Sequence, residues 1–564
     1  MRPSIEEVHT LLTAPGETYE MAETTVDGLR VRFWKNAPAD LTRVLRSSAA
    51  HGEKTFLVYE NERIRFDEHF ARAAWLSHRL RDEFGVRSGD RVAIAMRNLP
   101  EWPIAFWAIA AAGAVVVPLN AWWTGAELEY GLADSGAKVL FADAERWECL
   151  APRLPLGSVE ALVVARAGAL PEHVRRFEDL AGAPPPGIDL PEVAIRPDDH
   201  ATLFYTSGTT GRPRGVVGSH RNICTNLWSV GFARARTHLR SGAQRPALDQ
   251  PEENPAFLLS VPFFHATGCH SILLSTTALG AKLVLMHKWS PERALELIER
   301  ERITTFGGVP AMAWEVLESQ AFARHDTSSL RSVRYGGAPA PPELVRRIDA
   351  RLPGRIPSNG YGMTETSAIT STNAGEDYRE RPDSVGVPVP VCDVRVVDAD
   401  GRELPRGEIG ELWIRGPNVV KGYWNQPEAT AESFTDGWVH TGDLARIEAE
   451  GFIYVVDRAK DVVIRGGENV YCTQVERVLF EHPGVLDAAV IGVSHRVLGE
   501  EVGAVIVPRP GAVFSGQDIR DHVAAQMAAY NVPAHVWIRD RALPRNPAGK
   551  VLKRELKREL APPG

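Results

Sequence analysis

The chain has 564 residues, of which 44% are hydrophobic and 24% charged, together with 48 glycines and 40 prolines. These proportions are those of an ordinary globular protein and exclude the disordered, collagen-like and coiled-coil classes. The 72 acidic and 64 basic residues give a net charge of −8, and because a nucleic-acid-binding domain usually carries a basic excess, we expect no nucleic-acid partner.

The five cysteines are far apart and form no metal-like spacing, which predicts a reducing compartment. The chain begins MRPSIEEVHTLLTAPG, which is acidic where a secretory signal would be basic and then apolar. Residues 104–119 carry no charge, but a membrane span needs about 20 residues, so a buried helix followed by a buried strand is favoured. We expect a cytoplasmic protein without a membrane span; peripheral membrane contact and a homodimer stay open.

Up to about residue 200, helical and strand patterns alternate, as in residues 66–84 (helix) and 90–96 (strand). This alternation is typical of an α/β domain, and it predicts doubly wound sheets. Residues 182–197 are rich in proline and glycine and predict a connection, while the polar residues 235–254 predict a surface loop.

After about residue 385, short alternating runs such as residues 410–416 and 451–457 predict a small β-rich subdomain. The last hundred residues predict a separate α+β module, in which Thr473 and Glu476 form a capping box for a helix. Strand-like runs follow, and then a helix around residues 516–529. The expected fold is α/β: a large N-terminal domain of doubly wound sheets plus a small β-rich subdomain, with a small α+β C-terminal domain.

The strongest local signal is YTSGTTGRPRG at residues 205–215, directly after a strand-like apolar run. Glycines let backbone N–H groups approach an anion, hydroxyls donate hydrogen bonds and arginine supplies charge, so this loop suits a phosphate. It is not a Walker A loop, because that pattern fails at Pro213. Taken alone, a Gly/Thr loop is more often only flexible.

The whole string resembles the phosphate loop of the AMP-forming adenylating enzymes, the superfamily of acyl-CoA synthetases, luciferases and peptide-synthetase adenylation domains. Further strings match that superfamily in its own order, and together they cover the chain from about residue 50 to the C-terminus. They are PFFHATG (262–268), YGGAPAP (335–341), SNGYGMTE (358–365), GELWIRGPNVVKGYW (410–424), HTGD (440–443), DRAKDVVIRGGENVY (457–471) and PRNPAGKV (544–551).

The resemblance implies an ATP-dependent acid–thiol ligase with ATP, Mg²⁺ and CoA as cofactors. A small-molecule carboxylic acid would attack the α-phosphorus of ATP to give an acyl-adenylate and pyrophosphate, and the CoA thiol would then displace AMP. The implied organisation is an adenylate-forming domain over residues 1–459 and a mobile domain over residues 460–564, with Lys460 as the hinge. A surface-turn lysine is the plain alternative for Lys460.

Lys550 resembles the superfamily's catalytic lysine, whose ammonium would bridge the acid and the α-phosphate; an exposed lysine at the start of an amphipathic tail is the alternative. Glu365 would hold Mg²⁺, against the alternative of a solvated acid. His265 would lie beside the acyl pocket, against a core histidine. Thr206 completes the implied catalytic set. The implied ATP/AMP-binding residues are Thr206, Ser207, Gly208, Thr209, Thr210, Gly211, Arg214, Gly336, Gly337, Ala338, Pro339, Asn359, Gly360, Tyr361, Gly362, Thr364, Asp443 and Arg458.

Arg465, Gly466 and Gly467 would line the channel for CoA. Two departures from the superfamily pattern are present. Arg214 stands where lysine is typical, and charge survives although the geometry differs. Residues 530–533 read YNVP instead of Tyr-Lys-x-Pro, which removes a charge near the implied CoA entrance.

Amino-acid-activating relatives carry an aspartate where this chain has His265, so an uncharged acyl chain or an aromatic acid is favoured. The small residues that follow His265 suggest a roomy apolar pocket. The first expectation is a medium- or long-chain fatty acid, because the start of the chain is similar to bacterial fatty-acyl-CoA ligases. A cinnamate- or benzoate-type aromatic acid, or transfer to a carrier protein, is the alternative. A noncatalytic nucleotide-binding protein would require Lys550, Glu365 and Asp443 all to be idle.

Overall fold

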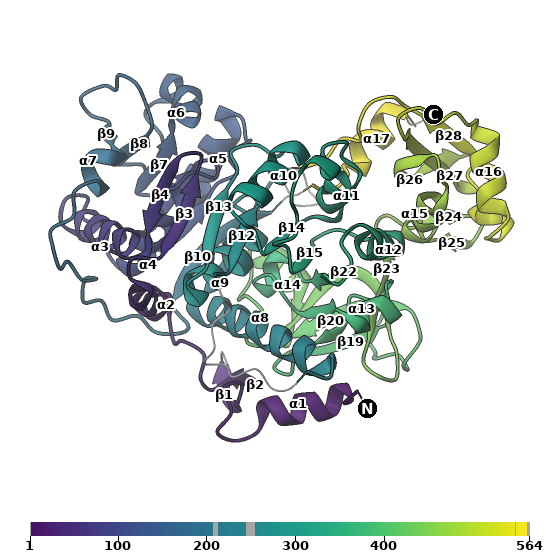
Figure 1. Ribbon diagram of the computed structural model, residues 1–564, viewed down its shortest axis with the longest axis horizontal. Helices are drawn as coiled ribbons and strands as arrows, with labels where there is room; N and C mark the ends of the chain where they lie inside the picture. The colour runs from purple at the N-terminus through teal and green to yellow at the C-terminus, as the bar shows by residue number, and fades with distance from the viewer. Residues whose placement is uncertain (1, 27, 207–211, 244–253, 547–548, 561–564) are drawn as a thin grey trace.

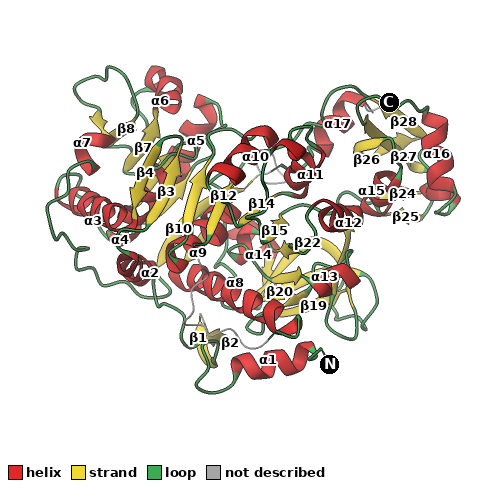
Figure 2. Ribbon diagram, viewed as in Figure 1, coloured by secondary structure: helices red, strands yellow, loops and turns green. Residues whose placement is uncertain are grey.

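The computed structural model describes residues 2–26, 28–206, 212–243, 254–546 and 549–560. Figure 1 shows a large body and a smaller unit at its upper right, which the chain reaches last. Figure 2 shows that helices and strands are mixed throughout both parts. The phosphate-loop residues Ser207, Gly208, Thr209, Thr210 and Gly211 lie outside the described residues.

A seven-stranded sheet forms the first half of the large body, in the order β11-β10-β6-β5-β7-β8-β9. Its strands are buried on both faces, because alternate residues of each strand enter two different apolar clusters: Ile94 and Phe141 point to one, Ala93 and Leu140 to the other. The strands are β5 (Arg91–Ala95), β6 (Val115–Pro118), β7 (Val139–Asp143), β8 (Ala161–Ala165), β9 (Arg175–Arg176), β10 (His200–Thr206) and β11 (Arg214–Ser219). The helices along this stretch are α3 (Phe66–Asp82), α4 (Glu101–Ala111), α5 (Gly125–Ser135), α6 (Ala144–Leu150) and α7 (Phe177–Ala181).

A nine-stranded sheet follows, in the order β18-β17-β16-β15-β14-β12-β13-β3-β4. One apolar cluster lies between the two sheets, since Phe257 and Leu283 belong to it together with Ile94 and Phe141. The strands are β3 (Thr55–Tyr59), β4 (Glu62–Arg65), β12 (Ala256–Leu259), β13 (Lys282–Leu285), β14 (Thr305–Gly308), β15 (Ser332–Gly336), β16 (Ile356–Tyr361), β17 (Ser371–Ala374) and β18 (Val387–Pro388). The helices are α2 (Leu41–Ser48), α8 (His220–Arg240), the π-helix η3 (Thr267–Leu273), α9 (Leu274–Leu279), α10 (Pro291–Arg300), α11 (Pro310–Glu318), α12 (Pro342–Arg351) and α13 (Glu376–Glu380).

The strands β14, β15 and β16 run parallel, so their carboxyl ends share one edge of the nine-stranded sheet. In open α/β sheets, ligands bind outside such carboxyl ends. The N-terminal α1 (Ile5–Thr13) and the hairpin of β1 (Met21–Val26) and β2 (Leu29–Trp34) pack far from this edge, against α8.

The β-rich subdomain and the C-terminal unit are both confirmed. The subdomain is a five-stranded sheet of β19 (Asp393–Val397), β20 (Gly410–Arg415), β21 (Phe434–Thr435), β22 (Trp438–Ile447) and β23 (Ile453–Arg458), with α14 (Pro427–Ser433). The C-terminal unit comprises β24 (Val463–Arg465), β25 (Glu468–Val470), α15 (Cys472–Glu481), β26 (Val485–His495), β27 (Gly499–Pro508), α16 (Gly516–Ala524), β28 (His535–Ile538) and α17 (Lys553–Leu560).

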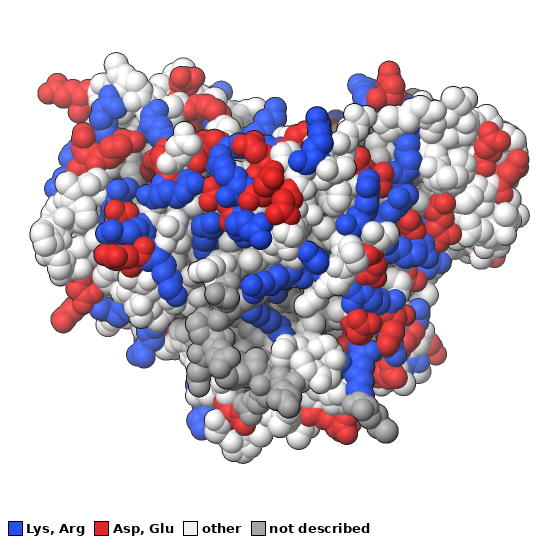
Figure 3. Space-filling model, viewed as in Figure 1, with Lys and Arg blue, Asp and Glu red and all other residues white. Residues whose placement is uncertain are grey.

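The charge-free residues 104–119 form α4 and then β6, as expected. Every residue of α4 is buried, and this explains why the helix has no polar face. Among the described residues, no helix has both the length and the apolar character that crossing a bilayer requires. On the face in view in Figure 3, basic and acidic side chains are interspersed over both parts of the molecule.

Three local predictions are wrong. Residues 235–240 are the end of α8 and not part of a surface loop. The charge of Arg236 can be buried in this helix because its guanidinium donates a hydrogen bond to the Thr372 carbonyl oxygen (2.8 Å). The helix expected over residues 516–529 ends at Ala524.

The capping box at Thr473 and Glu476 is also absent. The helix α15 begins at Cys472 with Tyr471 as its N-cap. The Thr473 hydroxyl donates to the Val456 carbonyl oxygen, and the Glu476 carboxylate pairs with Lys553 (2.7 Å) and accepts from the Val490 amide (2.8 Å). Tertiary partners therefore take both side chains that would have capped the helix.

Candidate active site

A candidate site at the carboxyl edge of β15 and β16 collects residues from four separate parts of the chain. Strand β16 supplies Tyr361, and the short 3₁₀ helix η5 (Thr364–Thr366) after it supplies Thr364 and Glu365. Strands β22 and β23 supply Asp443 and Arg458, which are directly paired across the two strands. The loop before α17 brings Lys550 to the same place. The positive charge of Lys550 is near enough to lower the pKa of both Glu365 and His265.

Asp443 is the acceptor at the centre of the site. The Tyr361 hydroxyl donates to its Oδ2 (2.6 Å), and Arg458 Nε donates to its Oδ1 (2.9 Å). Burial, and the neighbouring Asp443 carboxylate, hold the pKa of Tyr361 far above its usual value, so the hydroxyl stays a donor. An ionised carboxylate has about four lone-pair sites, so Asp443 keeps acceptor capacity for two further hydroxyls.

Glu365 is a buried carboxylate beside these groups, with 6% of its surface exposed. Its Oε1 accepts from the Tyr423 hydroxyl (3.0 Å). Burial raises the pKa of Glu365, while the Tyr423 hydrogen bond and the nearby Lys550 lower it. A cation placed beside this carboxylate would therefore offset its desolvation.

The described residues contain no cluster of three or more histidine, cysteine or acidic side chains that could by itself hold a metal ion. Mg²⁺ does not need one, because it commonly binds through one or two carboxylates together with phosphate oxygens and water. A single buried carboxylate such as Glu365 therefore fits a Mg²⁺ ion that arrives with a polyphosphate.

Lys550 lies in a turn that its own backbone and side chains hold closed. The Lys550 amide donates to Asn546 Oδ1 (2.9 Å), and the Asn546 amide donates to the Lys550 carbonyl oxygen (2.9 Å). Arg545 donates to the Gly549 carbonyl oxygen (2.8 Å) and pairs with Asp487 of β26 (2.6 Å). The turn is thus anchored to the C-terminal unit while its lysine enters the site.

Gly549 is where this turn meets the large body. Its φ is +77°, and a Cβ built on it would overlap Val309 Cγ2 at the start of α11. Any other residue would push the turn away from α11. Lys550 is exposed, and desolvation by neighbouring protein atoms together with the Arg458 cation lowers its pKa, partly opposed by Asp443 and Glu365.

His265 follows β12 and is partly buried. Among the described residues its Nε2 atom, which solvent does not reach, has no hydrogen-bond partner. Burial, and to a smaller extent the Lys550 cation, lower the pKa of His265 to about 4, so its ring is neutral near pH 7. His270, five residues further on, is buried against Phe204, and its Nδ1 lies 3.3 Å from the Ser367 carbonyl oxygen.

Thr206 and Arg214 are paired across β10 and β11, on either side of the undescribed loop residues. The Arg214 guanidinium lies over the Tyr423 ring (5.4 Å), as cation–π pairs do. Tyr423 thus joins Arg214 to Glu365. The motifs do not indicate this role: Tyr423 lies inside the matched string 410–424, but it is 58 residues from Glu365 and no spacing connects them.

The glycines at the ends of β15 and β16 allow close approach of backbone segments. A Cβ on Gly336 would overlap the Gly360 carbonyl oxygen, so the two strands approach too closely for a side chain. Gly337 and Pro339 are exposed and Ala338 is half-buried. Asn359 is buried, and its side chain hydrogen-bonds Tyr378 behind the site. A Cβ on the last glycine of this group, Gly362, would overlap the Ala368 carbonyl oxygen.

The expected hinge and CoA-channel residues lie elsewhere. Lys460 is exposed in the turn between β23 and β24, where the Asp461 amide donates to the Arg458 carbonyl oxygen (2.9 Å). Arg465, Gly466 and Gly467 form the turn of the β24–β25 hairpin, and the Gly466 amide donates to the Leu498 carbonyl oxygen (2.8 Å). Figure 1 shows this hairpin and α17 at opposite edges of the C-terminal unit.

Comparisons with known proteins agree with this arrangement. Residues 44–424 match the model of the family described as AMP-binding enzyme, and residues 474–550 match that of the AMP-binding enzyme C-terminal domain. The chain is 38% identical to a feruloyl-CoA synthase from Amycolatopsis sp over 87% of this chain and 92% of that protein. It is 31% identical to a long-chain-fatty-acid–CoA ligase from Bacillus subtilis (strain 168) over 92% and 94%. Among solved structures, the anthranilate CoA ligase AuaEII in complex with anthranoyl-AMP aligns with a TM-score of 0.81 and 27% identity, over 93% of this chain and 98% of that one.

Proposed function

The chain belongs to the AMP-binding enzyme family, and we propose that it is an ATP-dependent ligase that converts an aromatic carboxylic acid to its CoA thioester through an acyl-adenylate. The observation that carries the proposal is the convergence of Lys550, Glu365, Asp443 and Arg458 at one site. Two cations and two carboxylates meet there, at the edge of the sheet where a nucleotide binds in α/β proteins.

In the first step, an oxygen of the substrate carboxylate forms a bond to the α-phosphorus of ATP, and the bond to the pyrophosphate oxygen breaks. Negative charge grows on the phosphate oxygens, so the protein contributes mainly position and electrostatic stabilisation. The Lys550 ammonium lies at the junction of acid and phosphate and offsets that charge. Mg²⁺, bound with the ATP phosphates, would supply further positive charge beside Glu365.

The nucleotide is held by the groups around Asp443. Its carboxylate accepts the two ribose hydroxyls, with Tyr361 and Arg458 fixing its orientation from the protein side. Gly336, Gly337 and Ala338 leave room for the adenine. Thr206 and Arg214 flank the loop that would contact the phosphates. Thr364, next to Glu365 in η5, would face the phosphates from the opposite side.

In the second step, the CoA thiol loses its proton to solvent and its sulfur bonds to the acyl carbon, the bond from that carbon to the phosphate oxygen breaks, and AMP leaves. Lys550 must withdraw so that the thiol can enter. Residues 460–564 would turn about Lys460 relative to residues 1–459, and Arg465, Gly466 and Gly467 would replace the Lys550 turn at the site. Because both turns belong to one compact unit, a single hinge motion exchanges them.

The aromatic substrate is supported by the identity to feruloyl-CoA synthase over most of both chains. The neutral His265 ring and the absence of an aspartate at that position suit an acid without an ammonium group. The medium- or long-chain fatty acid named first from the sequence is the second candidate, and the similarity to the Bacillus subtilis fatty-acid ligase favours it.

A substrate panel tests the proposal. We expect ferulate, 4-coumarate or benzoate, with ATP, Mg²⁺ and CoA, to release pyrophosphate and form a thioester with a kcat/KM at least about tenfold above that for octanoate or palmitate, a ratio worth about 1.4 kcal/mol. A preference for palmitate would favour the second candidate. No acid-dependent release of pyrophosphate from any member of the panel would contradict the ligase itself.

Replacing Lys550 separates the two steps. Lys550→Ala is expected to slow acid-dependent pyrophosphate–ATP exchange by about 10²- to 10³-fold, as loss of one charge-stabilising donor does in other active sites. Thioester formation from supplied acyl-adenylate and CoA should stay within about threefold of the wild type. Lys557→Ala, on the exposed side of α17, is the matched control. Equal losses in both steps would refute the role of Lys550.

Tyr423→Phe should shift the pH dependence of the first step. The Tyr423 hydroxyl stabilises ionised Glu365, so its loss raises the carboxyl pKa further. Because that carboxylate acts ionised, activity is lost as pH falls through its pKa, and the acidic limb of the exchange rate should move up by about one pH unit. Tyr454→Phe, on β23, is the control. An unmoved or lowered acidic limb would show that Tyr423 does not tune Glu365.

A further inference from the structure

The helix α11 contacts the C-terminal unit at both of its ends. Val309, its N-cap, meets Gly549 of the Lys550 turn. Trp314, in the middle of the helix, lies 6.4 Å from the ring of Phe480 in α15. Glu318, its last residue, pairs with Arg509 at the end of β27 (2.8 Å). Trp314 and Glu318 are four positions apart and so share one face of the helix.

The pair of Glu318 and Arg509 is the strongest ionic contact in this group. Glu318 Oε2 accepts from Arg509 Nη1 (2.8 Å), and Oε1 lies 3.6 Å from Arg347 Nη1 of α12. The Arg509 guanidinium also lies over the Trp314 ring (5.6 Å). Only 17% of the Arg509 side chain and 24% of the Glu318 side chain are exposed, so solvent screens this pair less than an ordinary surface pair.

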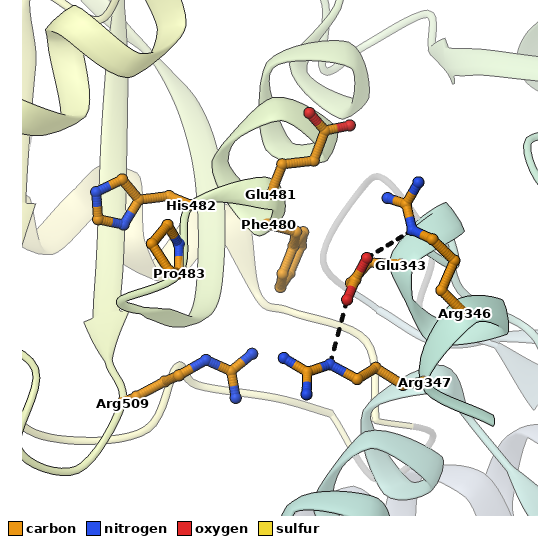
Figure 4. Close-up of a pocket in the computed structure, with 8 residues that line it drawn as sticks. All are labelled: Glu343, Arg346, Arg347, Phe480, Glu481, His482, Pro483 and Arg509. Atoms are coloured by element: carbon orange, nitrogen blue, oxygen red, sulfur yellow. Dashed lines mark hydrogen bonds and ion pairs between the residues drawn. The ribbon is translucent and has the colours of Figure 1, made fainter. Parts of the chain in front are cut away.

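A hollow of about 360 Å³ opens beside the pair. Figure 4 shows the guanidinium groups of Arg509 and Arg347 facing each other across it from the two parts of the molecule. The wall from α12 carries Glu343 and Arg346, and the wall from the C-terminal unit carries residues 480–483. The contact is therefore polar and not closely packed throughout, which is the character of interfaces that separate and re-form.

Separation would leave no isolated charge behind. When Arg509 moves away, Glu318 keeps Arg347 as a partner, and Arg347 in turn keeps Glu343 (3.2 Å). Breaking an ion pair is costly when one charge is left buried without a partner. Opening the pair of Glu318 and Arg509 leaves Glu318 with Arg347 as its partner. A second pair across the two parts, Arg477 with Asp383 (2.8 Å), is about half exposed and contributes less.

We propose that Glu318 and Arg509 form an orientation latch, which holds the C-terminal unit on α11 while Lys550 is in the site and opens before CoA reacts. Neither residue touches a reacting atom, and both are positioning residues for Lys550. The Gly549 contact at one end of α11 sets where the lysine enters, and the latch at the other end fixes the angle of the unit that carries it. The inference rests on the proposed two-step function.

The test measures the two steps separately in Glu318→Gln, Arg509→Gln and the double variant. Acid-dependent pyrophosphate–ATP exchange should fall about fivefold in each single variant and no further in the double, because partners in one contact are not additive. Thioester formation from supplied acyl-adenylate and CoA should be unchanged or up to about twofold faster. Glu376→Gln removes a half-exposed carboxylate that pairs with Arg379 of its own helix α13, and should leave both rates at the wild-type level.

Equal losses in both steps, additive losses in the double variant, or an unchanged exchange rate would each overturn the latch. These outcomes are distinct from failure of the proposed function, in which the wild-type chain itself would show no acid-dependent exchange. Arg509→Lys keeps the charge and should restore at least half of the exchange rate lost in Arg509→Gln; no restoration would also count against the latch.

Discussion

The position of Lys550 depends on one close approach, that of the Gly549 backbone to Val309. At this point the turn that carries Lys550 lies against the N-cap residue of α11 with no space for a side chain between them. The turn itself is held by Asn546 and Arg545 within the C-terminal unit. The position of the ammonium therefore follows from how that whole unit lies on the large body, and a side chain placed this way can be removed by moving the unit.

The shifted pKa values of Glu365 and Lys550 indicate that bound ligands would stabilise the charges of both side chains. Burial raises the pKa of Glu365, and the surrounding protein together with Arg458 lowers that of Lys550. Each pKa shift means that the ionised side chain is less stable in the protein, relative to its neutral form, than it is in water. A triphosphate brings negative charge to the lysine, and a divalent cation brings positive charge to the carboxylate, so binding of the nucleotide relieves both.

The sequence was most informative where burial alone decides structure. The charge-free residues 104–119 predict α4 and β6 because a segment buried on all sides needs no polar face, and the alternating runs after residue 385 predict the small sheets correctly. The predictions failed where tertiary partners compete with local ones. Thr473 and Glu476 bond to β23, β26 and Lys553 and do not cap α15, and Arg236 is buried in a helix because distant backbone oxygens accept from it.

The motifs named residues that the fold brings together, such as Tyr361, Asp443 and Arg458, but they say nothing of contacts between strings. Tyr423 and Glu365, or Glu318 and Arg509, are 58 and 191 residues apart, and only the fold brings them together. The motifs also do not identify the substrate acid. Small residues near His265 indicate space for it, whereas the choice between an aromatic ring and an acyl chain rests on the similarity to relatives.

A crystal structure of the chain with a non-reactive analogue of the aryl-adenylate would show whether Lys550 reaches the reacting atoms. We expect both ribose hydroxyls on Asp443, and Lys550 Nζ within hydrogen-bond distance of the oxygen that joins the acyl group to phosphorus. A nucleotide bound away from Asp443, or a Lys550 turn that cannot reach the analogue while Gly549 lies on Val309, would contradict the proposed role of Lys550.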